Sequence, residues 1–331
     1  MKVGLIDVDG HNFPNIPLMK ISAFHKREGD QVEWYRGILS DHMHRVYMSK
    51  VFSFTPDYPW VIDADEIVRG GSGYAIRLED GKEVYHKEID NDLPYEVEHM
   101  YPDYSLYPSM TKDTAYGFLT RGCPRGCGFC HVEAKEGRCS RKVADLDEFW
   151  KGQKKIVLCD PNILASADHK DLLQQLADSK AKVEFNQGLD IRLISDSNID
   201  LLRKVNLTQI HFAYDRYQDK DIIEPRLRAF SELGYNRSKG KVTVYILVNY
   251  DTTLEQDIER IQLCRELNFA PYPMIYDKEH ADPIYKKLQR WCNNFIFWGV
   301  PTFEEYDASA RKERKKNERS DQERRRNRGN T

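Results

Sequence analysis

The distribution of apolar residues predicts alternating strands and helices in the last two thirds of the chain. Short apolar runs predict strands at residues 117–119, 156–159, 183–185, 210–213, 242–248 and 273–276. Between them, amphipathic segments predict helices at 146–151, 168–180, 198–205, 222–233 and 254–267. The last helix has the clearest start, a capping box formed by Thr253 and Gln256. Since most of the strands lack strict polar alternation, we expect a parallel sheet covered on both faces, as a partial barrel or an open doubly wound sheet.

The first hundred residues predict a smaller α/β layer. Strand-like runs lie at 2–7, 32–35, 46–54 and 66–68, with a helical pattern at 14–28 and a hairpin signal, Asp80-Gly81, between 74–78 and 82–85. Residues 93–107, rich in Pro and Tyr, predict a connecting segment. We therefore expect an α/β domain at 1–105, a core at 106–305 and a tail at 306–331.

Composition narrows the class of protein. Of the 331 residues, 40% are hydrophobic and 11% aromatic, which is enough for a buried core and excludes wholesale disorder. No run reaches the roughly 18 apolar residues of a membrane helix. The first residues lack the apolar region and cleavage site of a signal peptide, so we expect a cytoplasmic protein without membrane contact.

Charge is distributed unevenly along the chain. The formal net charge is -3, which gives no overall case for nucleic-acid binding. Residues 308–331 hold ten Lys or Arg and four Asp or Glu, a net of +6, so the remainder carries -9. We interpret this segment as a disordered, solubilising tail; an arm that contacts nucleic acid is the alternative.

The most specific motif is a cysteine cluster directly after the first strand of the predicted core. Cys123, Cys127 and Cys130 have the spacing C-x3-C-x2-C in a loop rich in Gly and Pro. Thiolates suit iron–sulfur clusters or zinc. Three thiolates on a four-iron cluster leave one iron open, which is a catalytic rather than a structural arrangement. A zinc site that recruits His131 or Cys139, or a cluster that only transfers electrons, remains an alternative.

These residues resemble the signature of the radical S-adenosylmethionine (radical SAM) superfamily, C-x3-C-x-aromatic-C, with Phe129 at the aromatic position. The resemblance implies a partial (β/α)6 TIM-like barrel, the radical SAM core, preceded here by a small Rossmann-like α/β domain. It implies that the three cysteines bind a [4Fe-4S] cluster and that the open iron binds S-adenosylmethionine. Reductive cleavage then yields a 5'-deoxyadenosyl radical that takes a hydrogen atom from a substrate. Phe129 is expected beside the adenine.

Further cofactor contacts follow from the resemblance at the ends of the next two strands. Many radical SAM enzymes hold the amino group of SAM with a Gly-Gly-Glu-like motif after the second strand. This chain has Asp160-Pro161-Asn162 there, so Asp160 or Asn162 would take that role. After the third strand, the resemblance assigns Gln187, Asp190 and Arg192 to the ribose and carboxylate of SAM. The alternative for these polar residues is an ion pair that caps the next helix.

Later strand ends and the first domain supply weaker candidates. Asp215, Asn249 and Tyr276 follow the fourth, fifth and sixth strands and are candidates to face the substrate. The first domain is similar to the cobalamin-binding-like domain of B12-type radical SAM proteins, and His11 stands where an axial ligand is found. Pro14 replaces the glycine of that motif, which argues against cobalamin and favours a degenerate domain. The glycine-rich segment 70–73 predicts a turn rather than a phosphate site.

Two classes of function therefore stay open. The first is a radical SAM enzyme that takes electrons from a reductant such as flavodoxin or ferredoxin and acts on an unknown small molecule, peptide or RNA. The second is a zinc-stabilised nucleic-acid-binding protein that uses the basic tail. An RNA-modifying radical SAM enzyme would combine the two.

Overall fold

The computed structural model describes residues 1–10, 13–294 and 296–307. The chain divides into two compact units, Met1–Ile210 and a second unit that begins at His211. The predicted domain limits at residues 105 and 305 stay a prediction, and most of the predicted tail lies outside the described residues. Within the described ranges, no helix has both the length and the apolar character needed to span a bilayer.

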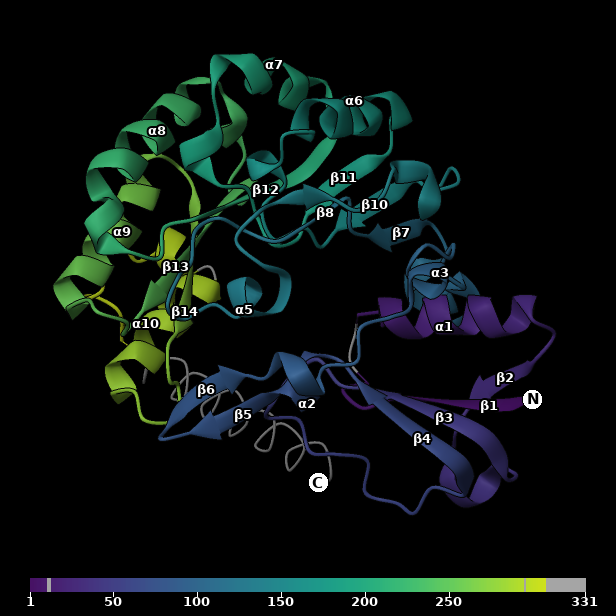
Figure 1. The fold of residues 1–331 in the computed structure, drawn as a ribbon. Coiled ribbons are helices and arrows are strands. Elements are labelled where there is room, and N and C mark those ends of the chain that lie inside the picture. The colour runs from purple at the N-terminus through teal and green to yellow at the C-terminus, as the bar shows by residue number, and fades with distance from the viewer. Residues whose placement is uncertain (11–12, 295, 308–331) are drawn as a thin grey trace, which may run out of the picture. The chain divides into compact units, whose positions relative to one another are not determined.

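The first sheet is parallel and has the strand order β2-β1-β3-β4. Its elements are β1 (Lys2–Asp7), α1 (Ile16–Arg27), β2 (Gln31–Trp34), β3 (Met43–Ser49) and β4 (Ala64–Gly70). Asn15 caps α1 by accepting a hydrogen bond from the backbone N–H of Leu18, and a proline stands in the first turn. Figure 1 shows α1 lying over one side of this sheet.

The predicted hairpin at Asp80-Gly81 is confirmed. Strands β5 (Ile76–Glu79) and β6 (Lys82–Tyr85) pair antiparallel. Both turn residues have positive φ, 48° at Asp80 and 76° at Gly81, as a two-residue hairpin turn requires. Short helices flank it, α2 (Ser72–Ala75) before the hairpin, and α3 (Tyr95–Glu98) and α4 (Pro108–Thr111) after it.

The second sheet has the strand order β14-β13-β12-β11-β10-β7. Its strands are β7 (Thr114–Gly117), β10 (Lys155–Leu158), β11 (Lys182–Phe185), β12 (Leu207–Ala213), β13 (Val242–Val248) and β14 (Ala270–Ile275). The helices that alternate with them are α6 (His169–Ser179), α7 (Asp196–Lys204), α8 (Lys220–Glu232), α9 (Leu254–Glu266) and α10 (Pro283–Asn293). The pairs β7/β10, β10/β11, β11/β12 and β13/β14 are parallel. The predicted α/β class is therefore confirmed, and the Thr253–Gln256 capping box forms as predicted.

Three predicted elements are wrong in extent. The strand predicted at 117–119 ends at Gly117, because the next backbone N–H groups, of Leu119 and Thr120, donate to the Asp160 side chain. The strand predicted at 46–54 ends at Ser49, because the N–H groups of Val51 and Phe52 donate to Asp9. The helix predicted at 146–151 is only a 3-10 turn, Leu146–Glu148. In each case side-chain bonds or turns end an apolar run that periodicity alone extends.

Candidate active site at the cysteine loop

The cysteine loop lies between β8 (Thr120–Arg121) and α5 (Val132–Glu136). Its first glycine, Gly122, is at a position that no other residue type could occupy without strain. Gly122 has φ 89°, and a Cβ there would lie 2.2 Å from the carbonyl oxygen of Cys139. Its N–H donates to the Glu136 carboxylate at 2.9 Å, and the N–H of Cys123 donates to the carbonyl of Gly137 at 3.2 Å. The loop therefore closes tightly on the chain that returns through β9 (Arg141–Lys142), which pairs with β8.

The three predicted metal ligands share this loop but are not assembled as a ligand set. Cys123 and Cys127 are half-buried and Cys130 is exposed. The N–H of Cys130 donates to the carbonyl of Cys127 at 2.9 Å, which makes a turn between them. Within the described part of the chain, no group of three or more His, Cys, Asp or Glu side chains is placed to hold a metal ion. The donor chemistry of three thiols suits a cluster, and their side chains would have to turn toward one another to bind it.

The carboxylate of Asp160, just after β10, is hydrogen-bonded to other groups of the chain. Its buried carboxylate accepts hydrogen bonds from the N–H of Leu119 at 3.1 Å, the N–H of Thr120 at 2.5 Å and the Thr120 hydroxyl at 2.7 Å. Burial raises the pKa of Asp160 to about 6, while these donors oppose the rise. Asp160 thus fixes the segment that enters the cysteine loop, and Asn162 is better placed than Asp160 to meet a ligand.

Asn162 has a buried acceptor that the chain does not use. Its Nδ2 lies 3.6 Å from Sγ of Cys123 and 3.3 Å from the Asp190 carboxylate. The residue is 4% exposed, and its Oδ1 has no hydrogen-bond partner among the described residues. An unmatched buried carbonyl costs about 1–3 kcal/mol, so a bound donor at this point would recover that energy.

An ion network connects the cysteine loop to the end of β11. Arg125, inside the loop, donates to Asp190 at 2.5 Å, and Arg192 donates to the other carboxylate oxygen at 2.7 Å. Burial would raise the pKa of Asp190, but the two guanidiniums, Arg192 foremost, hold that pKa below its usual value. Sequence reasoning missed Arg125. Its position between two cysteines of the motif was the available signal.

Of the remaining predicted contacts in the first unit, two lie among the described residues. Gln187 is exposed in the turn that precedes Asp190, and Phe129 is half-buried in the cysteine loop. His11, the predicted axial ligand, lies outside the described residues.

Residues 72–83 contact the segment that follows the cysteines. His131, next to Cys130, lies 3.3 Å from Glu83 on β6, and Lys135 on α5 donates to the Ser72 hydroxyl at 2.6 Å. Burial lowers the pKa of Lys135. The hairpin region therefore braces α5, and His131 already has a carboxylate partner in place of a metal.

The strand ends of the first sheet are closed by the chain. Asp9 accepts hydrogen bonds from the N–H groups of Val51 and Phe52, and from the Thr55 hydroxyl at 2.7 Å. Gly71 has φ 95°, and a Cβ there would lie 2.4 Å from the carbonyl oxygen of Lys50. The glycine-rich segment 70–73 thus makes a close contact between backbones where β4 ends and α2 begins.

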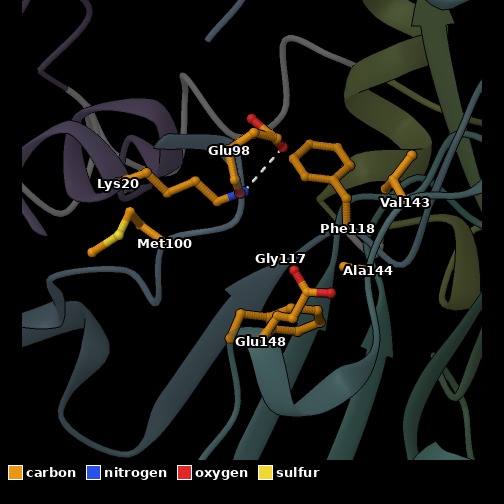
Figure 2. A pocket seen from close by; sticks show the side chains of 9 residues that line it. Lys20, Glu98, Met100, Gly117, Phe118, Val143, Ala144 and Glu148 are labelled. Carbon is orange, nitrogen blue, oxygen red and sulfur yellow. Dashed lines mark hydrogen bonds and ion pairs between the residues drawn. The ribbon is translucent and has the colours of Figure 1, made fainter. Parts of the chain in front are cut away.

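A small pocket lies at the end of β7, around the ion pair of Lys20 and Glu98. Figure 2 shows Lys20 reaching Glu98, with 3.0 Å between Nζ and the carboxylate, beside Phe118 and Glu148. Its volume of about 10 Å³ holds no more than a water molecule. Burial lowers the pKa of Lys20 more than Glu98 raises it. The pocket is a packing site for an ion pair and has no room for a substrate.

In the second unit, a buried arginine bonds the ends of two neighbouring strands, β12 and β13. Arg260 donates to the carbonyls of Tyr214 at 2.5 Å, Asp215 at 3.0 Å and Leu247 at 2.8 Å, and also to the Asp257 carboxylate. Arg260 and Asp257 are both fully buried. Their position on one face of α9 was the available signal, which the apolar pattern of that helix concealed.

The predicted substrate-facing residues of the second unit surround this pair. Asp215 accepts a hydrogen bond from the N–H of Leu247 at 3.0 Å. Asn249, at φ 64°, donates from its N–H to Asp257 at 3.1 Å and from its side chain to the carbonyl of Tyr276 at 3.0 Å. The Tyr276 ring is partly exposed and packs edge-on against Tyr250. These bonds fix the strand ends and leave the Tyr276 ring as the accessible group.

Comparison with known proteins gives one distant similarity. No protein-family model matches the chain. The chain is similar to an uncharacterized protein of Methanocaldococcus jannaschii, with 28% identity over 231 residues. The match covers 60% of this chain and 50% of that protein, so the chain spans about half the length of its relative. This similarity names no activity, and the function has to be inferred from the site.

Proposed function

We propose that the chain is a radical SAM enzyme. The observation that carries the proposal is the motif Cys123, Cys127, Phe129 and Cys130 on a glycine-dependent loop, with the unmatched Oδ1 of Asn162 next to Cys123. We further propose that the second sheet and its helices form a partial (β/α)6 barrel. The four-stranded sheet then represents a Rossmann-like domain that has lost its ligand.

The donor set fits a cluster bound by three protein ligands. The thiolates of Cys123, Cys127 and Cys130 would hold a [4Fe-4S] cluster, and the Gly-rich backbone lets the loop wrap around it. Together with S-adenosylmethionine, the cluster would supply one-electron chemistry that ends in hydrogen abstraction from a substrate.

The chain's own residues would bind and orient the sulfonium compound. Asn162 Oδ1 would accept a hydrogen bond from its ammonium group, which would satisfy this buried acceptor. Arg192, oriented by Asp190, has the planar fork that binds a carboxylate. Asp160 holds residues 119–120, and through them the start of the cysteine loop.

The reductant, substrate and tail complete the proposal. A small electron carrier of the flavodoxin or ferredoxin kind would deliver the electron. Nothing near the cysteine loop selects among small molecule, peptide and RNA, and the basic tail would favour RNA if it contributes to binding.

The test is anaerobic reconstitution with iron and sulfide, followed by dithionite and S-adenosylmethionine. The proposal predicts release of 5'-deoxyadenosine, measured by liquid chromatography and mass spectrometry. The Cys123→Ser variant should release none, and the Cys139→Ser variant should match the wild type. Stoichiometric zinc without iron, together with salt-sensitive RNA binding, would instead select the zinc-stabilised nucleic-acid-binding protein.

A further inference from the structure

A serine and a lysine meet at a place that the proposed function does not use. Ser72 is the first residue of α2, directly after β4, and Lys135 lies on α5. The Nζ atom of Lys135 lies 2.6 Å from the Ser72 hydroxyl oxygen. Both residues are partly exposed, so a substrate can reach the pair. A serine hydroxyl within hydrogen-bond distance of a lysine amine is the arrangement of nucleophile and base in serine–lysine dyads.

The turn that carries Ser72 is fixed by the glycines on either side of it. Gly71 has φ 95°, and a Cβ at Gly73 would lie 2.7 Å from the carbonyl oxygen of Phe52. The N–H of Gly73 also donates to the carbonyl of Lys50 at 2.9 Å. A sharp strand-to-helix turn of this kind is one way in which proteins present a nucleophilic serine. The glycines therefore hold the Ser72 hydroxyl at a defined place on the turn.

The surroundings of Lys135 favour its neutral amine. Of the carboxylates in the described residues, none forms an ion pair with it. Burial lowers the pKa of Lys135, and the neighbouring guanidinium of Arg121 adds to the effect. Three carboxylates, those of Glu136, Asp90 and Asp92, act in the opposite direction and do not cancel it. A lysine is a general base only when it is neutral, so this environment prepares the amine to accept the serine proton.

We propose that Ser72 and Lys135 form a serine–lysine dyad that hydrolyses a carboxylic ester. Ser72 Oγ attacks the carbonyl carbon and its proton passes to Lys135 Nζ. The bond to the leaving alcohol oxygen then breaks as that oxygen takes the proton. Water attacks the acyl-serine in the same way, which frees the acid and returns a proton through Lys135 to Ser72 Oγ.

The net reaction converts ester and water into acid and alcohol, and no oxidant or reductant takes part. An ester is the acyl donor that a two-residue site can cleave most readily, because an alkoxide is a better leaving group than an amide anion. The proposal does not rest on the proposed radical chemistry, because it involves no cysteine, iron or S-adenosylmethionine.

The test is labelling of the full chain with a fluorophosphonate, which modifies nucleophilic serines, followed by peptide mass spectrometry. The wild type should be labelled at Ser72, and Ser72→Ala should lose that label. Lys135→Met removes the base and should slow labelling about 100-fold or more, the usual contribution of a general base. Lys20→Met is the matched control: burial also lowers the pKa of Lys20, but Lys20 pairs with Glu98, and its change should leave the rate of labelling unaltered.

Lys135→Arg separates catalysis from a purely structural contact. Arginine can keep the hydrogen bond between α5 and α2 but stays protonated, so the dyad predicts slow labelling and a structural contact predicts the wild-type rate. In the wild type, the rate should rise with pH as Lys135 loses its proton, below the ordinary lysine pKa of 10.5. Circular dichroism checks that each variant folds.

Hydrolysis of p-nitrophenyl acetate gives a second readout and should fall in the same variants. A wild type that is not labelled at Ser72, or that hydrolyses this ester no faster than Ser72→Ala, would overturn the proposal. A Lys135→Arg variant that is labelled at the wild-type rate would also overturn it.

Discussion

The two parallel sheets both carry polar residues beyond their strand ends, yet they use them differently. In the first sheet, Asp9 accepts hydrogen bonds from three donors in the loop after β3, and Gly71 lies directly against the backbone of Lys50. In the second sheet, Asn162 keeps an unmatched buried oxygen beside Cys123. Strand-end position alone would assign a ligand to both. The comparison teaches that an unsatisfied buried group, rather than the topology, marks the edge at which a ligand is to be sought.

The largest expected effect concerns the cysteines. Cys123→Ser should lower bound iron after reconstitution from about four per chain to below about one tenth of that, because two thiolates cannot hold the cluster. Cys139→Ser is the control, since Cys139 contributes its backbone to the loop contact at Gly122. Iron and sulfide assays measure both. If Cys123→Ser still bound about four irons per chain, the proposed cluster site at the edge of the second sheet would be wrong.

Glycine substitutions test the closed edge. Gly71→Ala should cost about 3 kcal/mol or more in the free energy of unfolding, because the new Cβ meets the Lys50 carbonyl and the backbone is at φ 95°. Gly81→Ala, at φ 76° with open space around it, should cost about 1 kcal/mol. Urea denaturation measures the difference. Equal losses in the free energy of unfolding for the two variants would contradict the claim that the chain itself fills the strand ends of the first sheet. Purification of the chain with bound cobalamin would contradict it as well.

The ionisation of Asp160, at the edge of the second sheet, makes the stability of the chain depend on pH. Its folded-state pKa of about 6 exceeds its ordinary 3.8, so the folded chain binds a proton between these values while the unfolded chain does not. The Asp160 contribution to stability is therefore greatest at low pH and falls as pH rises through 6. Relative to Asp160→Asn, which cannot ionise, the wild type should lose on the order of 2–3 kcal/mol from pH 4 to pH 6. Parallel pH profiles from denaturation would contradict this assignment.

The smallest expected effect concerns the unmatched acceptor. Asn162→Ala should retain the cluster but bind S-adenosylmethionine about tenfold more weakly, the loss of roughly one hydrogen bond. Asn206→Ala is the control, because the side chain of Asn206 donates to the backbone carbonyl of Lys180 at the surface. Equilibrium dialysis of the reconstituted protein measures both. Unchanged affinity in Asn162→Ala would place the amino group of the ligand elsewhere.

Periodicity predicted the α/β class, the parallel second sheet and most elements because these depend on local patterns of apolar residues. The capping box at Thr253 and the turn at Asp80-Gly81 were equally local. Strand ends were less well predicted. Asp160 takes the N–H groups of residues 119 and 120 from 40 positions away, and Asp9 does the same for residues 51 and 52.

The candidate site, too, could be predicted from the sequence only in part. The cysteine spacing was visible in the sequence, as were Asn162 and Asp190 as polar residues after strands. Which of them the chain satisfies was not visible, because that depends on contacts such as Arg125 with Asp190, 65 residues apart. The buried Arg260–Asp257 pair was hidden for a related reason: charged residues on a helix are normally read as exposed.

The most direct test of the central claim is Mössbauer spectroscopy of the ⁵⁷Fe-reconstituted chain with and without S-adenosylmethionine. The account predicts that one iron of the four has a distinct signal that changes when the compound is added, since only three thiolates of the chain bind the cluster. Four equivalent irons with no change on addition would contradict it.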